Sequence, residues 1–132
     1  MTIAEFGRAL RAGTITSEKA TEACLARIAA RNRDWNAFIL VTGDEALRRA
    51  READRELAAG RDLGPLHGVP ISIKALYVLK GVRSASGSKV REDYIPKADP
   101  TVIQKLKEAG AIILGTTTTY EFAFGLDRKS VV

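Results

Sequence analysis

Three short apolar runs, set between longer helical patterns, constrain the fold of this 132-residue chain more than any other feature. The runs cover residues 37–42, 69–73 and 111–114. Each has the length of a strand, and the last is apolar throughout, as expected for a strand buried on both faces of a sheet. Helices that alternate with such strands predict an α/β fold. A sheet of only two or three strands would leave strand edges unpaired and exposed.

Four helices are predicted from capping residues and from apolar positions repeated at helical spacing. The second has its apolar stripe at Thr21, Cys24, Leu25 and Ile28. In the fourth helix, an aspartate is predicted to be the N-cap, and the proline that follows it is predicted to occupy the first helical position. The predicted N-terminal signals are, in chain order, Thr2 with Glu5, Thr16 or Ser17, Asp44, and Asp99 with Pro100.

Composition narrows the class of protein. The chain is 45% hydrophobic and 28% charged, which is typical of one globular domain. No apolar run is long enough to cross a bilayer, and the N-terminus lacks the basic and apolar regions of a signal peptide. A single cysteine, Cys24, excludes an internal disulfide and a cysteine metal cage, so a cytoplasmic location is expected. The net charge of +5 is scattered, which argues against a nucleic-acid partner.

The stretch from Gly64 to Lys74 holds the most chemical information. It reads Gly-Pro-Leu-His-Gly-Val-Pro-Ile-Ser-Ile-Lys, a turn that starts a short apolar strand ending in lysine. The ammonium group at such a position must leave the apolar layer or find partners within it. Burial lowers the pKa of a lysine and makes it a usable base.

This stretch and the blocks that follow it resemble the amidase-signature family. The matching blocks come in the family's order along nearly the whole chain: residues 64–74, Gly81, 85–89, 98–102 and 106–122. The resemblance implies the N-terminal part of the amidase-signature fold, in which helices precede a partial mixed sheet covered by helices. It also implies one incomplete domain with a helical part (1–60), the start of the catalytic core (61–125) and a divergent tail (126–132).

The family's active site implies a role for Lys74. The active site of the family is a Ser–cis-Ser–Lys triad. It hydrolyses amide C–N bonds of small-molecule substrates through an acyl-enzyme, without metal or cofactor. By resemblance Lys74 is the catalytic lysine. The two serines and the oxyanion donors come from a Gly/Ser-rich segment that follows Gly125 in the family and is absent from these 132 residues. The sequence therefore predicts a truncated amidase that is inactive alone.

Two positions depart from the family pattern, and several readings stay open. Ala75 follows the lysine where the family commonly has aspartate, and Thr116 stands where many members have lysine.

The alternatives to a truncated amidase are a non-catalytic fragment that pairs with a separate C-terminal half or associates with itself, a gene remnant, and a fragment of the A subunit of a glutamyl-tRNA amidotransferase.

Other conspicuous residues have structural interpretations. His67 stands alone in a turn without ligand-type neighbours, which favours packing over catalysis. Cys24 is expected in the core, Trp35 and Phe38 are expected to anchor the link between helix and strand, and Glu121 is expected to be structural and able to pair with a loop amide. The segment 84–88, rich in serine, is predicted to be a turn at the active-site rim.

Overall fold

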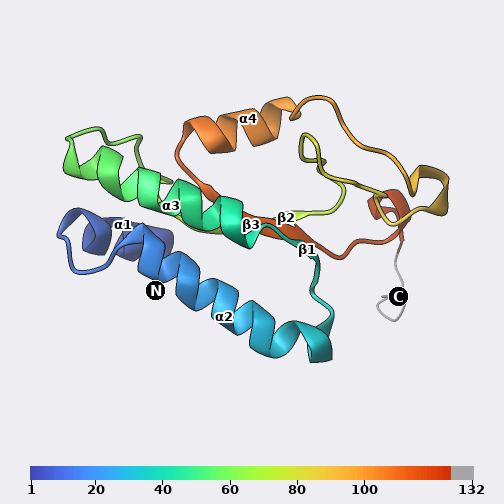
Figure 1. Cartoon of the computed structure of the whole chain (residues 1–132), viewed down its shortest axis with the longest axis horizontal. Helices are drawn as coiled ribbons and strands as arrows, with labels where there is room; N and C mark the ends of the chain where they lie inside the picture. The colour runs from blue at the N-terminus through green and yellow to red at the C-terminus, as the bar shows by residue number, and fades with distance from the viewer. Residues whose placement is uncertain (126–132) are drawn as a thin grey trace.

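A computed structural model of the chain describes residues 1–125. Four α-helices and three strands alternate along it: α1 (Ile3–Arg11), α2 (Ser17–Trp35), β1 (Phe38–Val41), α3 (Gly43–Ala58), β2 (Pro70–Lys74), α4 (Thr101–Glu108) and β3 (Ile112–Thr117). Short 3₁₀ turns lie at Lys89–Arg91 and Glu121–Ala123. The predicted α/β class and all the predicted helices and strands are confirmed (Figure 1).

The three strands form one mixed sheet in the order β1-β3-β2. β3 lies in the centre, antiparallel to β1 and parallel to β2. The ladder with β2 shifts register between Ile113 and Thr116, a step that includes Gly115, and the ladder with β1 shifts between Phe38 and Leu40. Gly115 has a φ of 150°, and a Cβ there would lie 2.1 Å from the carbonyl oxygen of Leu40. Only glycine allows the two strands to approach this closely at the bulge.

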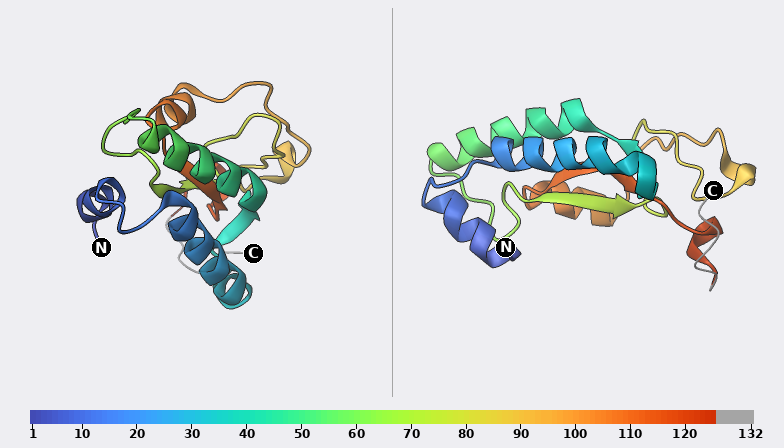
Figure 2. Two further views of the ribbon diagram at one scale, coloured as in Figure 1. Left: turned by 60° about the vertical axis from the view of Figure 1, so that its left-hand side comes forward. Right: turned by 90° about the horizontal axis from the view of Figure 1, so that it is seen from below.

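Helices cover both faces of the sheet (Figure 2). On one face Ile112 and Leu114 of β3 pack against α2 and the alanine stripe of α3, Ala46, Ala50 and Ala53. On the other face Ile73 packs against Leu79 and Ile103 of α4, with Ile113 beside them. A third cluster joins Phe6 and Leu10 of α1 to Val69 at the start of β2. The alternation of β3 between two cores explains why its sequence is apolar throughout.

The helix starts follow the predicted caps with two corrections. Thr2 and Glu5 form the capping box, and Thr16 caps α2. The N-cap of α4 is Pro100 rather than Asp99, whose carboxylate instead accepts hydrogen bonds from the amide of Lys80 at 2.7 Å and the ammonium of Lys107 at 2.5 Å. α3 begins at Gly43, one residue before the predicted Asp44.

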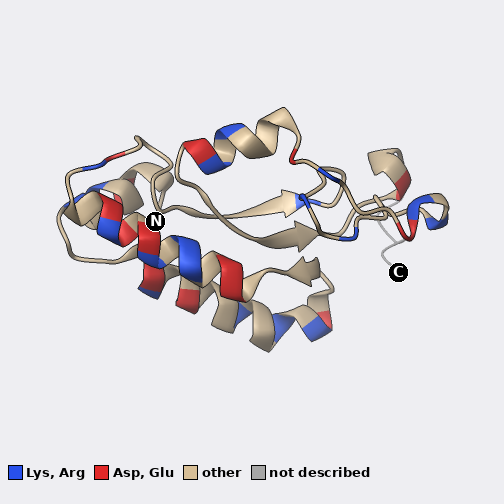
Figure 3. Cartoon of the chain, turned by 45° about the horizontal axis from the view of Figure 1, so that its top comes forward, with Lys and Arg blue, Asp and Glu red and all other residues tan. Residues whose placement is uncertain are grey.

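Charged side chains of both signs are interleaved along α2 and α3 (Figure 3). Arg48 pairs with Glu45 and Glu52 on the surface of α3, and Arg51 pairs with Glu18 of α2 at 2.5 Å. Asp54 has another role, since its carboxylate accepts hydrogen bonds from the amides of Ser17 and Glu18 and so caps α2 from the neighbouring helix. None of the helices in residues 1–125 is both long and apolar enough to cross a membrane.

Candidate active site

Lys74 is the last residue of β2, as predicted, and its side chain is exposed to solvent. Its neighbours Ile73 and Ala75 are buried, because successive residues of a strand point to opposite faces. The backbone around the lysine is held by two hydrogen bonds of 2.9 Å, from the amide of Ala75 to the carbonyl of Thr117 and from the amide of Tyr77 to the carbonyl of Lys74. The strand end therefore presents the ammonium group from a well-anchored backbone.

An apolar groove lies on the same face of β2 as Lys74. By the alternation of the strand, Lys74 shares this face with Pro70 and Ser72. Those two residues line a groove of about 350 Å³ that runs between β2 and α2. Its apolar wall comes from both layers and includes Cys24, Ile28, Trp35, Phe38 and Leu114.

The groove corrects one sequence expectation. Cys24 packs against the core beside Leu25 and Ile28, and Phe38 does the same, as expected. Trp35 does not anchor the link between helix and strand: 67% of it is exposed, with the guanidinium of Arg31 above its ring at 5.7 Å. Residue type alone could not reveal this, because the position of Trp35 at the end of α2 leaves it on the open wall of the groove.

The serines with hydrogen-bonded side chains are engaged away from Lys74. Ser17 donates to the carbonyl of Gly68 at 2.6 Å and is fully buried. Ser86 accepts from Arg91 at 3.4 Å, and Ser88 donates to Glu121 at 2.6 Å. Ser130 lies outside the described residues. None of the bonds made by Ser17, Ser86 and Ser88 joins a serine to the ammonium of Lys74.

The serine-rich loop 84–88 is tied to the chain that leaves β3. Glu121 is structural, as expected, although its carboxylate accepts from the hydroxyl of Ser88 rather than from a loop amide. The amide of Phe122 also donates to the carbonyl of Ser86 at 2.9 Å. Gly87 allows this contact: its φ is 74°, and a Cβ there would lie 2.9 Å from the carbonyl oxygen of Tyr120. The sequence did not predict this pairing, because the two segments lie far apart along the chain.

His67 is a packing residue, as predicted. It is buried, its Nδ1 accepts from the amide of Leu63 at 3.2 Å, and its Nε2 therefore carries the proton that faces the carbonyl of Ala53 at 2.8 Å. Both ring nitrogens are thus used to join the turn to α3. Within residues 1–125, no three histidine, cysteine, aspartate or glutamate side chains are grouped as metal ligands.

The described residues thus form a small α/β sheet with an exposed lysine at the end of one strand, on the face that carries an apolar groove. The family model described as Amidase matches residues 19–132, so the chain belongs to the amidase family. Its structural neighbours are amidase-signature enzymes. The peptide amidase from Stenotrophomonas maltophilia is one of them, with 34% identity, a TM-score of 0.85 and coverage of 92% of this chain and 25% of that one. A second comes from a structure described as a vestigial protein complex related to an s-triazine catabolic enzyme, with 33% identity, a TM-score of 0.87 and coverage of 92% and 27%.

Several curated relatives with similar sequences share the same name. The A subunit of glutamyl-tRNA(Gln) amidotransferase from Geobacter sp. (strain M21) is 43% identical over 98% of this chain. The protein of that name from Acidothermus cellulolyticus is 44% identical, also over 98%. The chain spans only 27% and 26% of the length of these two relatives.

Proposed function

We propose that this chain supplies the catalytic lysine, Lys74, of an amidase that hydrolyses amide C–N bonds, while residues outside these 132 supply the serines and the oxyanion donors. The observation that carries the proposal is the position of Lys74, exposed at the end of a strand within the segment matched to the family. In this mechanism the lysine accepts a proton through a bridging serine as the nucleophilic serine attacks the amide carbonyl. The same proton then passes to the departing amine.

The open edge of the sheet supports a site completed by more polypeptide. β2 is an edge strand, so its outer side has no partner strand among residues 1–125. Unpaired strand edges are ready-made surfaces for another strand. The apolar groove beside α2 lies on the face that Lys74 shares, so a segment that pairs with β2 would also reach the groove.

A second candidate within the family is the A subunit of a glutamyl-tRNA amidotransferase. It is favoured by the identity of 43% to 45% with curated relatives of that name. In that case the nitrogen released from the amide is transferred to another molecule instead of being released into solvent. A third reading, a non-catalytic chain that pairs with a separate half, predicts the same docking edge but no role for the ammonium of Lys74.

Replacing one residue in a hybrid enzyme tests the proposal. Residues 1–132 would replace the matching segment of the Stenotrophomonas maltophilia peptide amidase, and kcat/KM for amide hydrolysis would be measured. Lys74→Ala should lower kcat/KM about 1,000-fold, as expected for a general base. Lys97→Ala, at an exposed lysine outside both the groove and the cavity between α3 and α4, is the matched control and should change little. Equal activity of the two variants would rule out the catalytic role of Lys74.

A further inference from the structure

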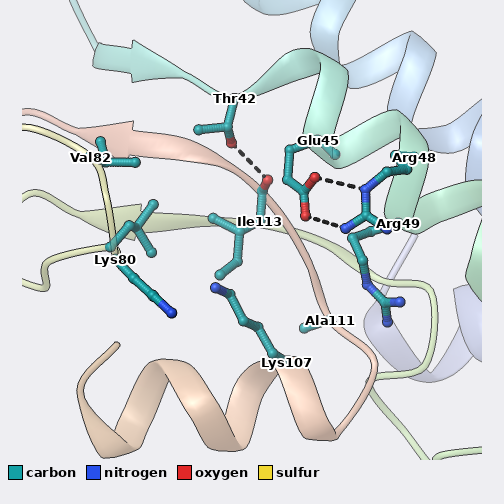
Figure 4. A pocket seen from close by; sticks show the side chains of 11 residues that line it. Thr42, Glu45, Arg48, Arg49, Lys80, Val82, Lys107, Ala111 and Ile113 are labelled. Carbon is teal, nitrogen blue, oxygen red and sulfur yellow. Dashed lines mark hydrogen bonds and ion pairs between the residues drawn. The ribbon is translucent and has the colours of Figure 1, made fainter. Parts of the chain in front are cut away.

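A second cavity lies between α3, α4 and the loop that follows β2, built from residues other than Lys74 (Figure 4). Its volume is about 390 Å³, which is within the range of small-molecule sites. Leu79, Val82 and Ile113 form an apolar lining. Thr42 closes the side next to β3, where its hydroxyl donates to the carbonyl of Ile113 at 3.0 Å.

Cations from three separate elements surround this apolar lining. Arg48 and Arg49 come from α3, Lys80 from the loop after β2, and Lys107 from α4. Figure 4 shows the side chains of Lys80 and Lys107 extending into the same space. Glu45 is the acidic residue of the lining, so the lining carries four positive groups and one negative group.

Internal ion pairs neutralise only part of this charge. Arg48 makes two hydrogen bonds to Glu45, at 2.6 and 2.8 Å, and Arg49 pairs with Glu52. Lys107 pairs with Asp99 at 2.5 Å. The ammonium of Lys80 makes no direct ion pair with a carboxylate of residues 1–125, although the charge of Asp99 acts on it from nearby.

The electrostatic environment of Glu45 indicates a positive field in the cavity. The hydrogen bond from Arg48 lowers the pKa of Glu45, and the nearby charges of Lys107 and Arg49 lower it further, although burial acts in the opposite direction. The charges of Lys107 and Arg49 therefore act on groups within this cavity, in agreement with the cations along its lining.

We propose that this cavity binds a small organic anion, with a carboxylate or phosphate head between Lys80 and Lys107 and an apolar body against Leu79, Val82 and Ile113. The two lysines provide charge-assisted hydrogen bonds to the head. An inorganic anion would leave the apolar lining exposed to water. A ligand with an apolar body buries that lining and should therefore bind more tightly. The site is independent of amide hydrolysis and does not involve Lys74.

Titration calorimetry and ligand-observed NMR test the proposal with four probes, on the 132-residue chain at a temperature below its melting transition and a concentration at which it is monomeric. Hexanoate and hexyl phosphate should both bind, and the tighter of the two identifies the head group. Hexanol lacks the charge and inorganic phosphate lacks the apolar body, so both should bind more weakly. Raising the salt concentration from about 0.1 M to about 1 M should weaken the binding of both acids, because it shortens the screening length from ~10 Å to ~3 Å.

Lys80→Gln is the decisive variant, with Lys97→Gln as the matched exposed control. The Lys80 side chain is exposed and makes no ion pair within residues 1–125, so its replacement should leave the fold intact. Loss of one exposed charge pair should weaken binding of the preferred acid about fivefold. The proposal is wrong if neither acid binds, if hexanol binds as tightly as hexanoate, or if the two variants behave alike.

Discussion

At the scale of single residues, the two chemically distinctive lysines of this chain differ in what surrounds them. Lys74 extends from a strand end whose neighbours are buried, so its backbone is fixed while its ammonium faces solvent. Lys80 lies in a loop and lines a cavity together with Arg48, Arg49 and Lys107. These different surroundings are the reason for proposing proton transfer for Lys74 and anion binding for Lys80.

Gly115 is the residue on which the sheet depends most. Gly115→Ala should destabilise the chain by more than about 3 kcal/mol, since the new Cβ would meet the Leu40 carbonyl at 2.1 Å and φ is 150°. Gly60→Ala is the matched control, because Gly60 also has a positive φ, 82°, but no atom lies within 4 Å of its Cβ position. That change should cost about 1 kcal/mol. Urea unfolding of both variants measures the difference, and equal losses would show that the close approach at the bulge is not a constraint.

At the scale of secondary-structure elements, most of the fold was predictable because its signals are local. The Thr2–Glu5 capping box and the alanine stripe of α3 act within a few residues, and both formed as predicted. The rest depends on contacts between distant segments. Asp99 bonds to Lys80 and Lys107 instead of capping α4, and the central place of β3 depends on its pairing with two strands that lie far from it in the sequence.

The site was predictable to a similar extent. The motif around Lys74 predicted a lysine at a strand end, and the structure has it there. The bond between Ser88 and Glu121 and the cavity beside Lys80 had no local signal, because each joins residues from elements that only the tertiary fold brings together. The scattered positive charge of the sequence gave no indication that four cations share one cavity.

The contact of Asp99 with α4 gives a pH-dependent prediction. Burial raises the pKa of Asp99, but hydrogen bonds from Lys107 and from the amide of Lys80 outweigh it and lower the pKa below its ordinary value. The carboxylate therefore stabilises the fold above a pH of about 4, and this contribution is lost as the pH falls through the lowered pKa.

Asp99→Asn should lower the free energy of unfolding by about 1 kcal/mol at neutral pH. The substitution removes the charge from these hydrogen bonds but leaves a side chain that can still make part of them. The difference from the unsubstituted chain should narrow as the pH falls below about 4. Thermal unfolding at a series of pH values measures this, with Asp93→Asn at an exposed position as the control. A difference that stays constant with pH would contradict the assigned contact.

At the scale of the whole molecule, the described residues leave apolar surface uncovered at the end of the sheet that carries Lys74. The exposed side chains there and along the nearby loops include Trp35 at 67%, Ile95 at 56%, Tyr77 at 45% and Phe122 at 44%. Together with the free edges of β1 and β2, this surface favours association with other polypeptide.

We therefore expect residues 1–132 on their own to self-associate or to have a low melting temperature. Analytical ultracentrifugation at several concentrations, combined with thermal melts, measures both properties. The sedimentation coefficient and the melting temperature should rise with concentration, and a C-terminal amidase segment added in trans should raise the melting temperature. A compact monomer with a sharp melt that does not depend on concentration would show that these residues close their own core.

The central claim is that the chain brings the lysine of an amidase and that the nucleophilic serine lies outside these 132 residues. A fluorophosphonate that reacts with activated serines, followed by mass spectrometry of the labelled site, tests it most directly. The chain alone should carry no adduct on any of its serines, and the hybrid with the peptide amidase should carry one on a serine outside residues 1–132. An adduct on a serine within the chain, such as Ser72 or Ser86, would contradict the claim.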